Sequence, residues 1–301
     1  MMARLFVACL AVAHALYDVR TTYGVTYARG LTNCTNGTNC LASRGLTLDL
    51  YEPVGAPGLK PLLVVIHGGS YCILDSNETG EVAQAEYFAA RGYVAASINY
   101  RLSGDRGNYP AGTDAFEPLF NASSWYGNNY DHMYPAVRDA KAAIRYLRSR
   151  ATDLGVDGAR VAASGSSAGA TSVMALVAAD EADFKDEEAD DPTLASTHVG
   201  ESSRIAAALS QWGAAYGVEV LEWLDGRPRV AATSPPLLAF AGTNDTVIVP
   251  ANSEWLCARY AAVGATCALH LLAGAGHGAW NATVGGRSQN DLAFDFFSKH
   301  L

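Results

Sequence analysis

The stretch Val161-Ala-Ala-Ser-Gly165-Ser-Ser167-Ala-Gly169-Ala170 decides the fold of this 301-residue chain. It has the form G-x-S-x-G, and it lies between a short apolar run that predicts a strand and an apolar segment, 167–179, that predicts a helix. On such a strand–turn–helix the serine sits at a sharp turn, and the close approach of strand and helix requires small residues at Gly165 and Gly169. The alternative, a phosphate-binding turn, lacks the lysine of a P-loop. We therefore predict that Ser167 is a nucleophile.

Two later turns supply the partners that a serine nucleophile needs. A serine hydroxyl is weak until a base takes its proton, and the base must be oriented by a third group. Asp245 follows the apolar run 237–241 and a glycine turn, and His277 follows the apolar run 268–272 and a glycine-rich turn. The order serine, acid, histidine and the position at strand ends fit a ligand site in an open α/β sheet. The sequence predicts a catalytic triad.

A third turn is expected to bind the oxygen that becomes negatively charged during acyl transfer. The continuous apolar run 62–66 ends in His67-Gly68-Gly69. Glycines leave backbone N–H groups open, so we predict that Gly68 and Gly69 donate hydrogen bonds together with Ala168, the residue after the nucleophile. One such donor contributes roughly 3 kcal/mol in the transition state. His67 is interpreted as a structural residue that holds the turn.

Apolar runs alternate with helical patterns along the chain, which predicts an α/β fold with a mostly parallel central sheet and helices on both faces. The opening runs 22–28 and 46–51 are expected to form an antiparallel edge. We expect one catalytic domain over residues 16–301. Segments 102–133 and 180–203 interrupt the alternation and are interpreted as insertions; the acidic second one is either a solvated loop or part of a lid.

Residues 1–15 have the pattern of a secretory signal peptide. Arg4 precedes the apolar run 5–13, and Ala13-His14-Ala15 is a small-x-small cleavage site, so the mature chain would begin at Leu16 and be secreted. The apolar runs are too short for membrane insertion. The net charge of −9 makes nucleic acid and anionic membranes poor partners. Nothing in the sequence fixes the oligomeric state.

Cysteine and asparagine positions agree with an exported chain. Five cysteines remain after the signal peptide, and the local pairs Cys34–Cys40 and Cys257–Cys267 would leave Cys72 free, although the sequence does not fix connectivity. No CxxC pair or tight His/Cys cluster is present, so no metal site is predicted. Sequons in loop-like segments predict glycans, which we place at Asn33, Asn36 and Asn121.

The stretches VVIHGGSYC (64–72), GSSAG (165–169) and GAGHG (274–278) resemble the α/β-hydrolase superfamily. Within it, the chain resembles the HGG-bearing esterases, namely the hormone-sensitive-lipase-like group and the carbohydrate esterases that include feruloyl and acetylxylan esterases. The resemblance implies the α/β-hydrolase fold and ester hydrolysis without metal or cofactor. Ser70 and Ser166 depart from the pattern, since many members have glycine and aspartate there, and this loosens the assignment to a subgroup.

Three aromatic residues near the predicted site are candidates for substrate binding, because aromatic rings stack on sugar and phenolic groups. They are Tyr71, Trp212 and Trp280. The expected substrate is a small-molecule or polysaccharide-linked ester, with acetyl and feruloyl esters as the leading examples. A lipase and a prolyl-oligopeptidase-like serine peptidase are alternatives, and a non-catalytic binding protein on a hydrolase fold is an alternative of another class.

Overall fold

A computed structural model describes residues 16–109, 130–184 and 198–301 of the chain. Its main sheet has eight strands in the order β1-β2-β4-β3-β5-β6-β7-β8. In chain order the strands are β1 (Val19–Thr32), β2 (Ala42–Pro53), β3 (Lys60–Ile66), β4 (Val94–Ile98), β5 (Val156–Ser166), β6 (Ala207–Gln211), β7 (Leu237–Gly242) and β8 (Cys267–Leu272), followed by the small hairpin β9 (Thr283–Val284) and β10 (Arg287–Ser288).

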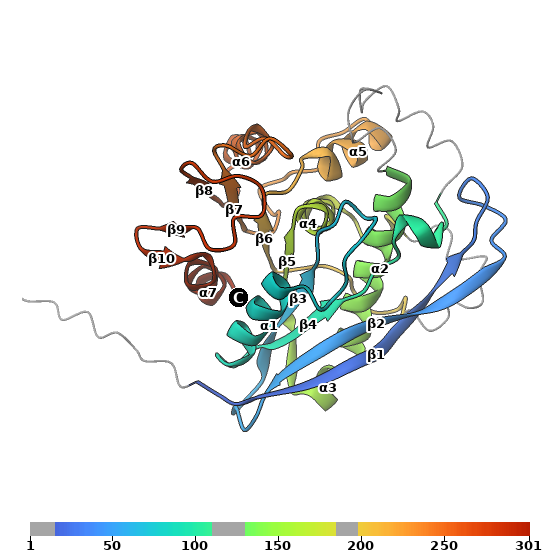
Figure 1. Cartoon of the computed structure of the whole chain (residues 1–301), viewed down its shortest axis with the longest axis horizontal. Coiled ribbons are helices and arrows are strands. Elements are labelled where there is room, and N and C mark those ends of the chain that lie inside the picture. Colours follow the sequence, from blue (N-terminus) through green and yellow to red (C-terminus); the bar gives the residue numbers. More distant parts are fainter. Residues whose placement is uncertain (1–15, 110–129, 185–197) are drawn as a thin grey trace, which may run out of the picture.

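The antiparallel pairs of the main sheet all involve β2, at its N-terminal edge. β1 pairs antiparallel with β2, and β2 pairs antiparallel with β4, whereas every later neighbour is parallel. Figure 1 shows the long β1–β2 pair along one border of the sheet. The predicted α/β-hydrolase fold with its antiparallel N-terminal edge is therefore confirmed.

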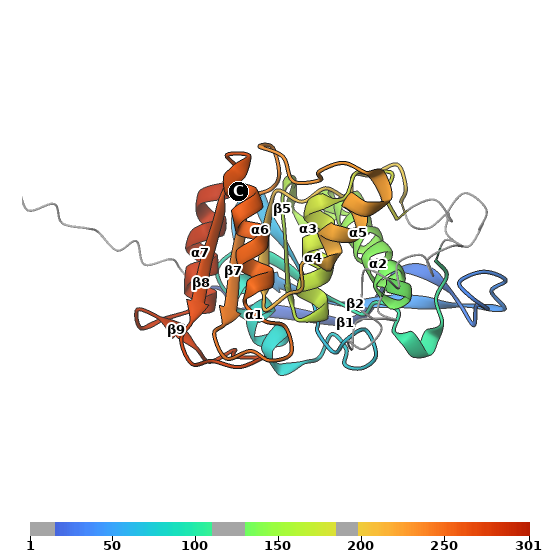
Figure 2. The same ribbon diagram turned by 90° about the horizontal axis from the view of Figure 1, so that it is seen from above.

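Helices cover both faces of the sheet. The helices are α1 (Thr79–Ala89), α2 (Tyr130–Ser149), α3 (Ala151–Leu154), α4 (Ala168–Ala178), α5 (Tyr216–Asp225), α6 (Ala251–Ala262) and α7 (Gln289–His300), with a 3-10 turn, η1, at Ser103–Asp105. One apolar core contains residues of α2, α4, α5 and α6, and a second contains residues of α1 and α7. Figure 2 shows α7 and α2 on opposite sides of α4.

Burial on both faces explains why the strand sequences lack alternation. The last five residues of β3 and all six residues of β7 are buried, so each position faces one of the two cores. The continuous apolar runs 62–66 and 237–241 were correctly interpreted as strands for this reason.

Two helices differ from the sequence expectation. The apolar spacing of Val137, Ile144 and Leu147 predicts a helix over 134–150, but α2 begins one turn earlier, at Tyr130, and contains Pro135. A proline removes one helical hydrogen bond, and burial of Met133 and Tyr134 favours the extra turn. α5 was not predicted at all, because Gly217 and the β-branched Val218 and Val220 have low helix propensity.

The boundaries of the domain and of its two insertions stay predictions. Of the expected insertion 102–133, the structure places η1 and the start of α2, and residues 110–129 lie outside the described part. Residues 185–197 of the second expected insertion, 180–203, also lie outside the described part of the chain. The predicted signal peptide and Asn121 lie outside the described part too.

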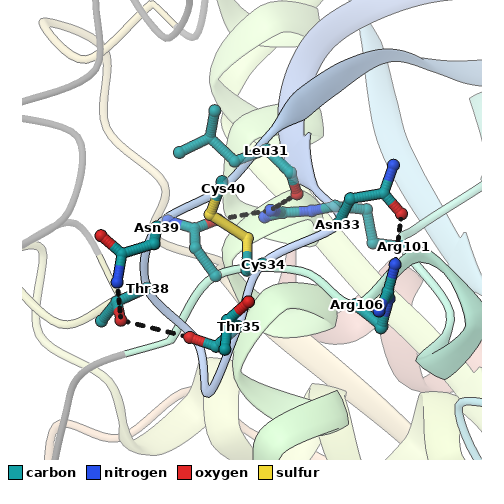
Figure 3. Close-up of a disulfide and its surroundings, with 10 residues drawn as sticks. Leu31, Asn33, Cys34, Thr35, Thr38, Asn39, Cys40, Arg101 and Arg106 are labelled. Carbon is teal, nitrogen blue, oxygen red and sulfur yellow. Dashed lines mark hydrogen bonds between the residues drawn. A yellow bond between two sulfur atoms is a disulfide. The ribbon is translucent and has the colours of Figure 1, made fainter.

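Both expected cysteine pairs form disulfides, Cys34–Cys40 and Cys257–Cys267, and Cys72 is a free, exposed thiol. Figure 3 shows the first disulfide closing the loop between β1 and β2. The predicted glycan sites Asn33 and Asn36 are exposed on this loop, where the Asn33 side-chain oxygen accepts a hydrogen bond from Arg106 at 2.9 Å. Within the described residues, none of the helices combines the length and apolarity that a membrane crossing requires.

Candidate active site

Ser167 occupies the sharp turn between β5 and α4. Its backbone has φ 51° and ψ −116°, a conformation that costs a non-glycine residue free energy and recurs at functional sites. The Ser167 N–H donates to the Gln211 carbonyl at 2.9 Å, which fixes the turn against the end of β6. The turn thus holds the Ser167 hydroxyl ahead of α4, whose N-terminus favours negative charge.

The two glycines of the motif allow backbone segments to touch. A Cβ added to Gly169 would lie 2.0 Å from the Ile66 carbonyl oxygen in β3. A Cβ added to Gly165 would lie 2.4 Å from the Gly169 carbonyl carbon. Real Cβ atoms do not approach so closely, so the sequence requirement for small residues at these two positions is explained by contact between β5, α4 and β3.

His277 joins the acid to the nucleophile. Its Nδ1 lies 2.8 Å from Asp245 Oδ2, and its Nε2 lies 2.9 Å from Ser167 Oγ. An ionised carboxylate can only accept, so Nδ1 carries the proton and Nε2 accepts from the Ser167 hydroxyl. The Asp245 side chain is fully buried, whereas 24% of the His277 side chain is exposed. The three predicted residues are therefore brought together in the arrangement of a catalytic triad.

Backbone contacts hold the acid and histidine turns. Asp245 Oδ1 accepts the N–H groups of Val247 at 2.8 Å and Ile248 at 2.9 Å, which leaves Oδ2 for the histidine. The Asn244 N–H donates to the Ala275 carbonyl at 2.9 Å. The turn that carries Asp245 is thereby joined to the turn that carries His277, and the carboxylate is oriented before substrate binds.

The turn after β3 lies against the nucleophile. A Cβ added to Gly68 would be 3.2 Å from the Ser167 Cβ. Gly69 has φ 91°, and Ser70 and Tyr71 follow with φ 54° and 60°. Three successive residues in the left-handed region form a strained turn of the kind found at functional sites. The structure places Gly68 against Ser167, Gly69 and Ala168 adjoin these two residues in sequence, and the roles of all three as oxyanion donors stay predictions.

His67 is a neutral support of this turn. It is buried, and burial lowers its pKa to about 4, although a hydrogen bond with the Gly68 carbonyl acts in the opposite direction. Its Nδ1 lies 2.9 Å from the Gly68 oxygen, and its ring stacks on Tyr100 with centroids 4.1 Å apart. The Tyr100 hydroxyl donates to the same Gly68 oxygen at 2.8 Å. These contacts agree with the structural interpretation of His67.

The three candidate substrate-binding residues have different surroundings. Tyr71 is fully buried, and its hydroxyl donates to the Ala168 carbonyl at 2.8 Å, so it ties the strained turn to α4. Trp212 is buried with its ring edge against His277, at a centroid distance of 6.3 Å. Trp280 is partly exposed and packs edge-on against Trp212 at 5.2 Å. Their contact with substrate stays a prediction.

Sequence reasoning missed a set of buried polar residues behind the triad. Glu81 of α1 accepts a hydrogen bond from the Ser166 hydroxyl at 2.5 Å. Gln84 donates to Gln211 at 3.2 Å, and Gln211 donates to Gln289 at 3.1 Å. Glu81 and Gln84 are polar positions one turn apart on a helix that packs on the sheet, and this was the signal available in the sequence.

Within residues 16–109, 130–184 and 198–301, no three His, Cys, Asp or Glu side chains are grouped so that they could hold a metal ion. The predicted absence of a metal site and of a cofactor stays a prediction.

The region that carries the triad matches a known family. The model of the prolyl oligopeptidase family matches residues 119–301, which include Ser167, Asp245 and His277. The chain belongs to the prolyl oligopeptidase family. A second model, named BD-FAE, matches residues 48–115 of this family member, which include the turn with Gly68 and Gly69.

Esterases are among the proteins similar to this member of the prolyl oligopeptidase family. It is 31% identical to gut esterase 1 of Caenorhabditis elegans over 44% of the chain, and 32% identical to carboxylesterase NlhH of Mycobacterium tuberculosis over 45%. It spans only 20% and 36% of those two relatives. An esterase 2 structure from Thermogutta terrifontis shares the fold with a TM-score of 0.61 and 23% identity, covering 95% of each chain. The predicted resemblance to α/β-hydrolase esterases is confirmed.

Proposed function

We propose that this protein is a secreted serine carboxylesterase that forms an acyl-enzyme on Ser167. The observation that carries the proposal is the pair of distances from His277, 2.8 Å to Asp245 and 2.9 Å to Ser167. This geometry fits acyl transfer by a serine nucleophile. The similarity to gut esterase 1 and carboxylesterase NlhH supports esters as the substrates.

The mechanism follows from the hydrogen bonds of the triad. His277 Nε2 takes the Ser167 proton while Oγ attacks the ester carbonyl carbon, and Asp245 stabilises the imidazolium that forms. Gly68, Gly69 and Ala168 are the predicted donors to the oxyanion. His277 then protonates the leaving alcohol, and water attacks the acyl-enzyme with the same histidine as base.

The aromatic pair beside the histidine supports an ester whose alcohol or acyl part is a sugar or a phenolic group. Trp280 is partly exposed and lies over the first turn of α1, where a Cβ added to Gly80 would be 2.3 Å from its ring. The Trp212 ring packs edge-on against the Trp280 ring and holds it in place. We propose acetyl or feruloyl esters of polysaccharides as the natural class, since stacking on sugar and phenolic rings suits an exposed indole.

The first test is hydrolysis of p-nitrophenyl esters from acetate to palmitate by residues 16–301. We expect activity on short acyl chains, and its loss in Ser167→Ala. Ser253→Ala is the matched control, because Ser253 is a buried serine on α6 outside the triad. A maximum at long acyl chains would identify a lipase, and a folded protein inactive on every ester would contradict the proposal and favour a non-catalytic binding protein.

Polysaccharide esters require a separate measurement. Acetylated xylan and methyl ferulate should be hydrolysed by the wild-type protein. Trp280→Ala should raise KM for both and leave KM for ethyl acetate unchanged, because ethyl acetate has neither a sugar nor an aromatic ring. Equal effects on all three substrates would contradict the stacking role. Chromatography of the acetate and ferulate released by hydrolysis measures the two reactions.

Peptide hydrolysis is the second candidate function, because the chain belongs to the prolyl oligopeptidase family. The same triad could cleave a peptide bond. Proline-containing peptide amides, assayed beside the matching esters, separate the two functions. A higher kcat/KM for the amides would replace the esterase proposal.

Secretion is proposed from the signal-peptide pattern at residues 1–15, and both disulfides agree with an oxidising compartment. Expression of the full chain in a eukaryotic secretory host should release a protein that begins at Leu16. Mass spectrometry of its peptides would show whether Asn33, Asn36 and Asn121 carry glycans. An intracellular product that retains Met1 would contradict this part of the proposal.

A further inference from the structure

Leu74 has a backbone conformation that a leucine rarely adopts. Its φ is 76°, in the left-handed region that bulky side chains avoid. Just before it, the Cys72 and Ile73 N–H groups donate to the Gly69 carbonyl at 2.9 and 3.2 Å, so the chain forms one helical turn. A left-handed residue commonly follows such a turn, and it is usually glycine, which has no Cβ to strain. A leucine in this place has a free-energy cost, and strain of this kind is concentrated at functional sites.

The Leu74 side chain lies against the predicted oxyanion turn. A Cβ added to Gly69 would be 2.9 Å from Leu74 Cγ. On the neighbouring residue of the same turn, a Cβ added to Gly68 would be 3.2 Å from the Ser167 Cβ. The pair of glycines thus contacts the predicted nucleophile at one residue and Leu74 at the next.

Contact with the protein interior does not account for this side chain. Leu74 is 40% exposed, and its neighbour Ile73 is 62% exposed. Within the described ranges, Leu74 belongs to neither apolar core and is not among the side chains packed on them. A single exposed leucine is ordinary, but this leucine is exposed, strained and adjacent to a predicted catalytic turn. Its apolar surface is therefore available to a bound molecule.

The order of the strands indicates which part of an ester lies on this side of the site. β3 and β8 lie on opposite sides of β5 in the sheet, so the turn with Gly69 and the turn with His277 flank Ser167 from two sides. In the proposed mechanism His277 protonates the leaving alcohol, so the alcohol oxygen faces the β8 side. The acyl carbons next to the carbonyl then face the β3 side, where Leu74 lies.

We infer that Leu74 is a specificity-determining residue, whose side chain contacts the first carbons of the acyl group and favours acyl groups longer than acetyl. The inference rests on the proposed function as a serine esterase. An apolar contact stabilises the transition state in proportion to the area that it removes from water. An acetyl group offers a single methyl group, so acetate esters provide the reference.

Leu74→Ala is the decisive variant, assayed on p-nitrophenyl butyrate and p-nitrophenyl acetate, which have the same leaving group. We expect the ratio of kcat/KM for butyrate to kcat/KM for acetate to fall about 4- to 15-fold, which corresponds to lost contact with one or two methylene groups. Leu74→Met keeps an apolar side chain of similar volume and should keep the ratio within about twofold of wild type. The ratio for butyl acetate and ethyl acetate, which differ only in the alcohol, should not change.

Two further variants serve as controls. Leu59→Ala should keep the wild-type ratio, because Leu59 is an exposed leucine just before β3, at the opposite end of that strand from the site. Leu74→Gly separates the side chain from the backbone. Glycine adopts the left-handed conformation without strain, so this variant should unfold at a higher temperature than Leu74→Ala and show the same loss in the butyrate ratio.

The readouts separate failure of the inference from failure of the proposed function. A wild-type protein with neither ester hydrolysis nor labelling of Ser167 by a fluorophosphonate would refute the proposed function. With an active wild type, an unchanged or higher butyrate ratio in Leu74→Ala would overturn the inference alone. The same holds for a loss that Leu74→Gly does not share, that Leu59→Ala shares, or that appears equally in the alcohol ratio. If Leu74→Ala does not fold, the ratios in Leu74→Gly decide.

Discussion

The nucleophile turn and the histidine turn of the site are both rich in glycine, and the glycines are needed for different reasons. In the nucleophile turn, Gly165 and Gly169 fill positions where an added Cβ would lie within 2.4 Å of neighbouring backbone. In the histidine turn, Gly276 and Gly278 have open space around the same position. Gly278 has φ 75°, whereas Gly276 has an ordinary φ. Gly274, in the same turn, also has a positive φ, 70°, with open space around it. Glycine is therefore needed for its small volume in the nucleophile turn, and for its backbone conformation at Gly274 and Gly278 in the histidine turn.

The difference shows how each catalytic group is held. The nucleophile turn is fixed by direct contact of three backbone segments, which allows little adjustment. The histidine turn projects from the sheet and is located by hydrogen bonds, chiefly those of Asp245 and of the turn that carries it. Substitutions in the first turn should therefore affect folding, and substitutions in the second should affect orientation.

Asp245→Asn should have the largest effect on activity. An asparagine can donate its NH₂ group to His277, which favours the tautomer that cannot accept the Ser167 proton. We expect kcat to fall on the order of 10⁴-fold, with the fold preserved. Ester hydrolysis and circular dichroism of the same preparation test this, and a loss under tenfold would show that the acid does not set the tautomer.

Gly169→Ala should have the largest effect on stability. The added Cβ would be 2.0 Å from the Ile66 oxygen and 2.5 Å from the His67 oxygen, both of which are backbone atoms that cannot rotate away. We expect a loss of more than about 3 kcal/mol in the free energy of unfolding, since overpacking forces the backbone to move. Urea denaturation measures it, and a stable variant would mean that α4 can shift from β3.

Gly278→Ala should have an intermediate effect. The left-handed conformation costs an alanine roughly 1 to 2 kcal/mol, with no steric clash. Gly278→Asn is the control, because asparagine tolerates this conformation better and should recover part of the loss. Thermal unfolding and kcat should fall together, and an equal loss in both variants would point to a contact rather than to the backbone angle.

Gly276→Ala should have the smallest effect. The added Cβ meets nothing within 4 Å, and the φ is not in the left-handed region. We expect the free energy of unfolding to stay the same or to rise by about 0.4 to 1 kcal/mol, because alanine restricts the unfolded chain. A loss above about 1 kcal/mol, measured by urea denaturation beside wild type, would break the distinction between the two turns.

Local patterns in the sequence predicted the sheet and the triad because each rests on neighbouring residues. The G-x-S-x-G stretch predicts the turn at Ser167, and the apolar runs before Asp245 and His277 predict the strands that end at the other two turns. α5 was missed because its burial depends on α4 and outweighs the weak propensities of Gly217 and Val218.

Glu81 could not be found by the same reasoning. Its hydrogen-bond partner, Ser166, lies 85 residues away in sequence, and a glutamate in the first turn of a helix is expected to be solvated and to stabilise the helix dipole. Tyr71 shows the same limit. Its hydroxyl donates to the carbonyl of Ala168, 97 residues away, a contact that local sequence patterns do not report, and its predicted contact with substrate stays a prediction.

The hydrogen-bonded side-chain amides of Gln84, Gln211 and Gln289 bear on the order in which the site can assemble during synthesis. Gln211 accepts from Gln84 and donates to Gln289, and Gln289 in turn donates to the Ala279 carbonyl beside the histidine at 2.7 Å. The nucleophile is synthesised more than a hundred residues before α7, which supplies the last link. A nascent chain that contains Ser167 but not yet the later segments therefore lacks both the base and the hydrogen bond by which α7 holds the segment after His277.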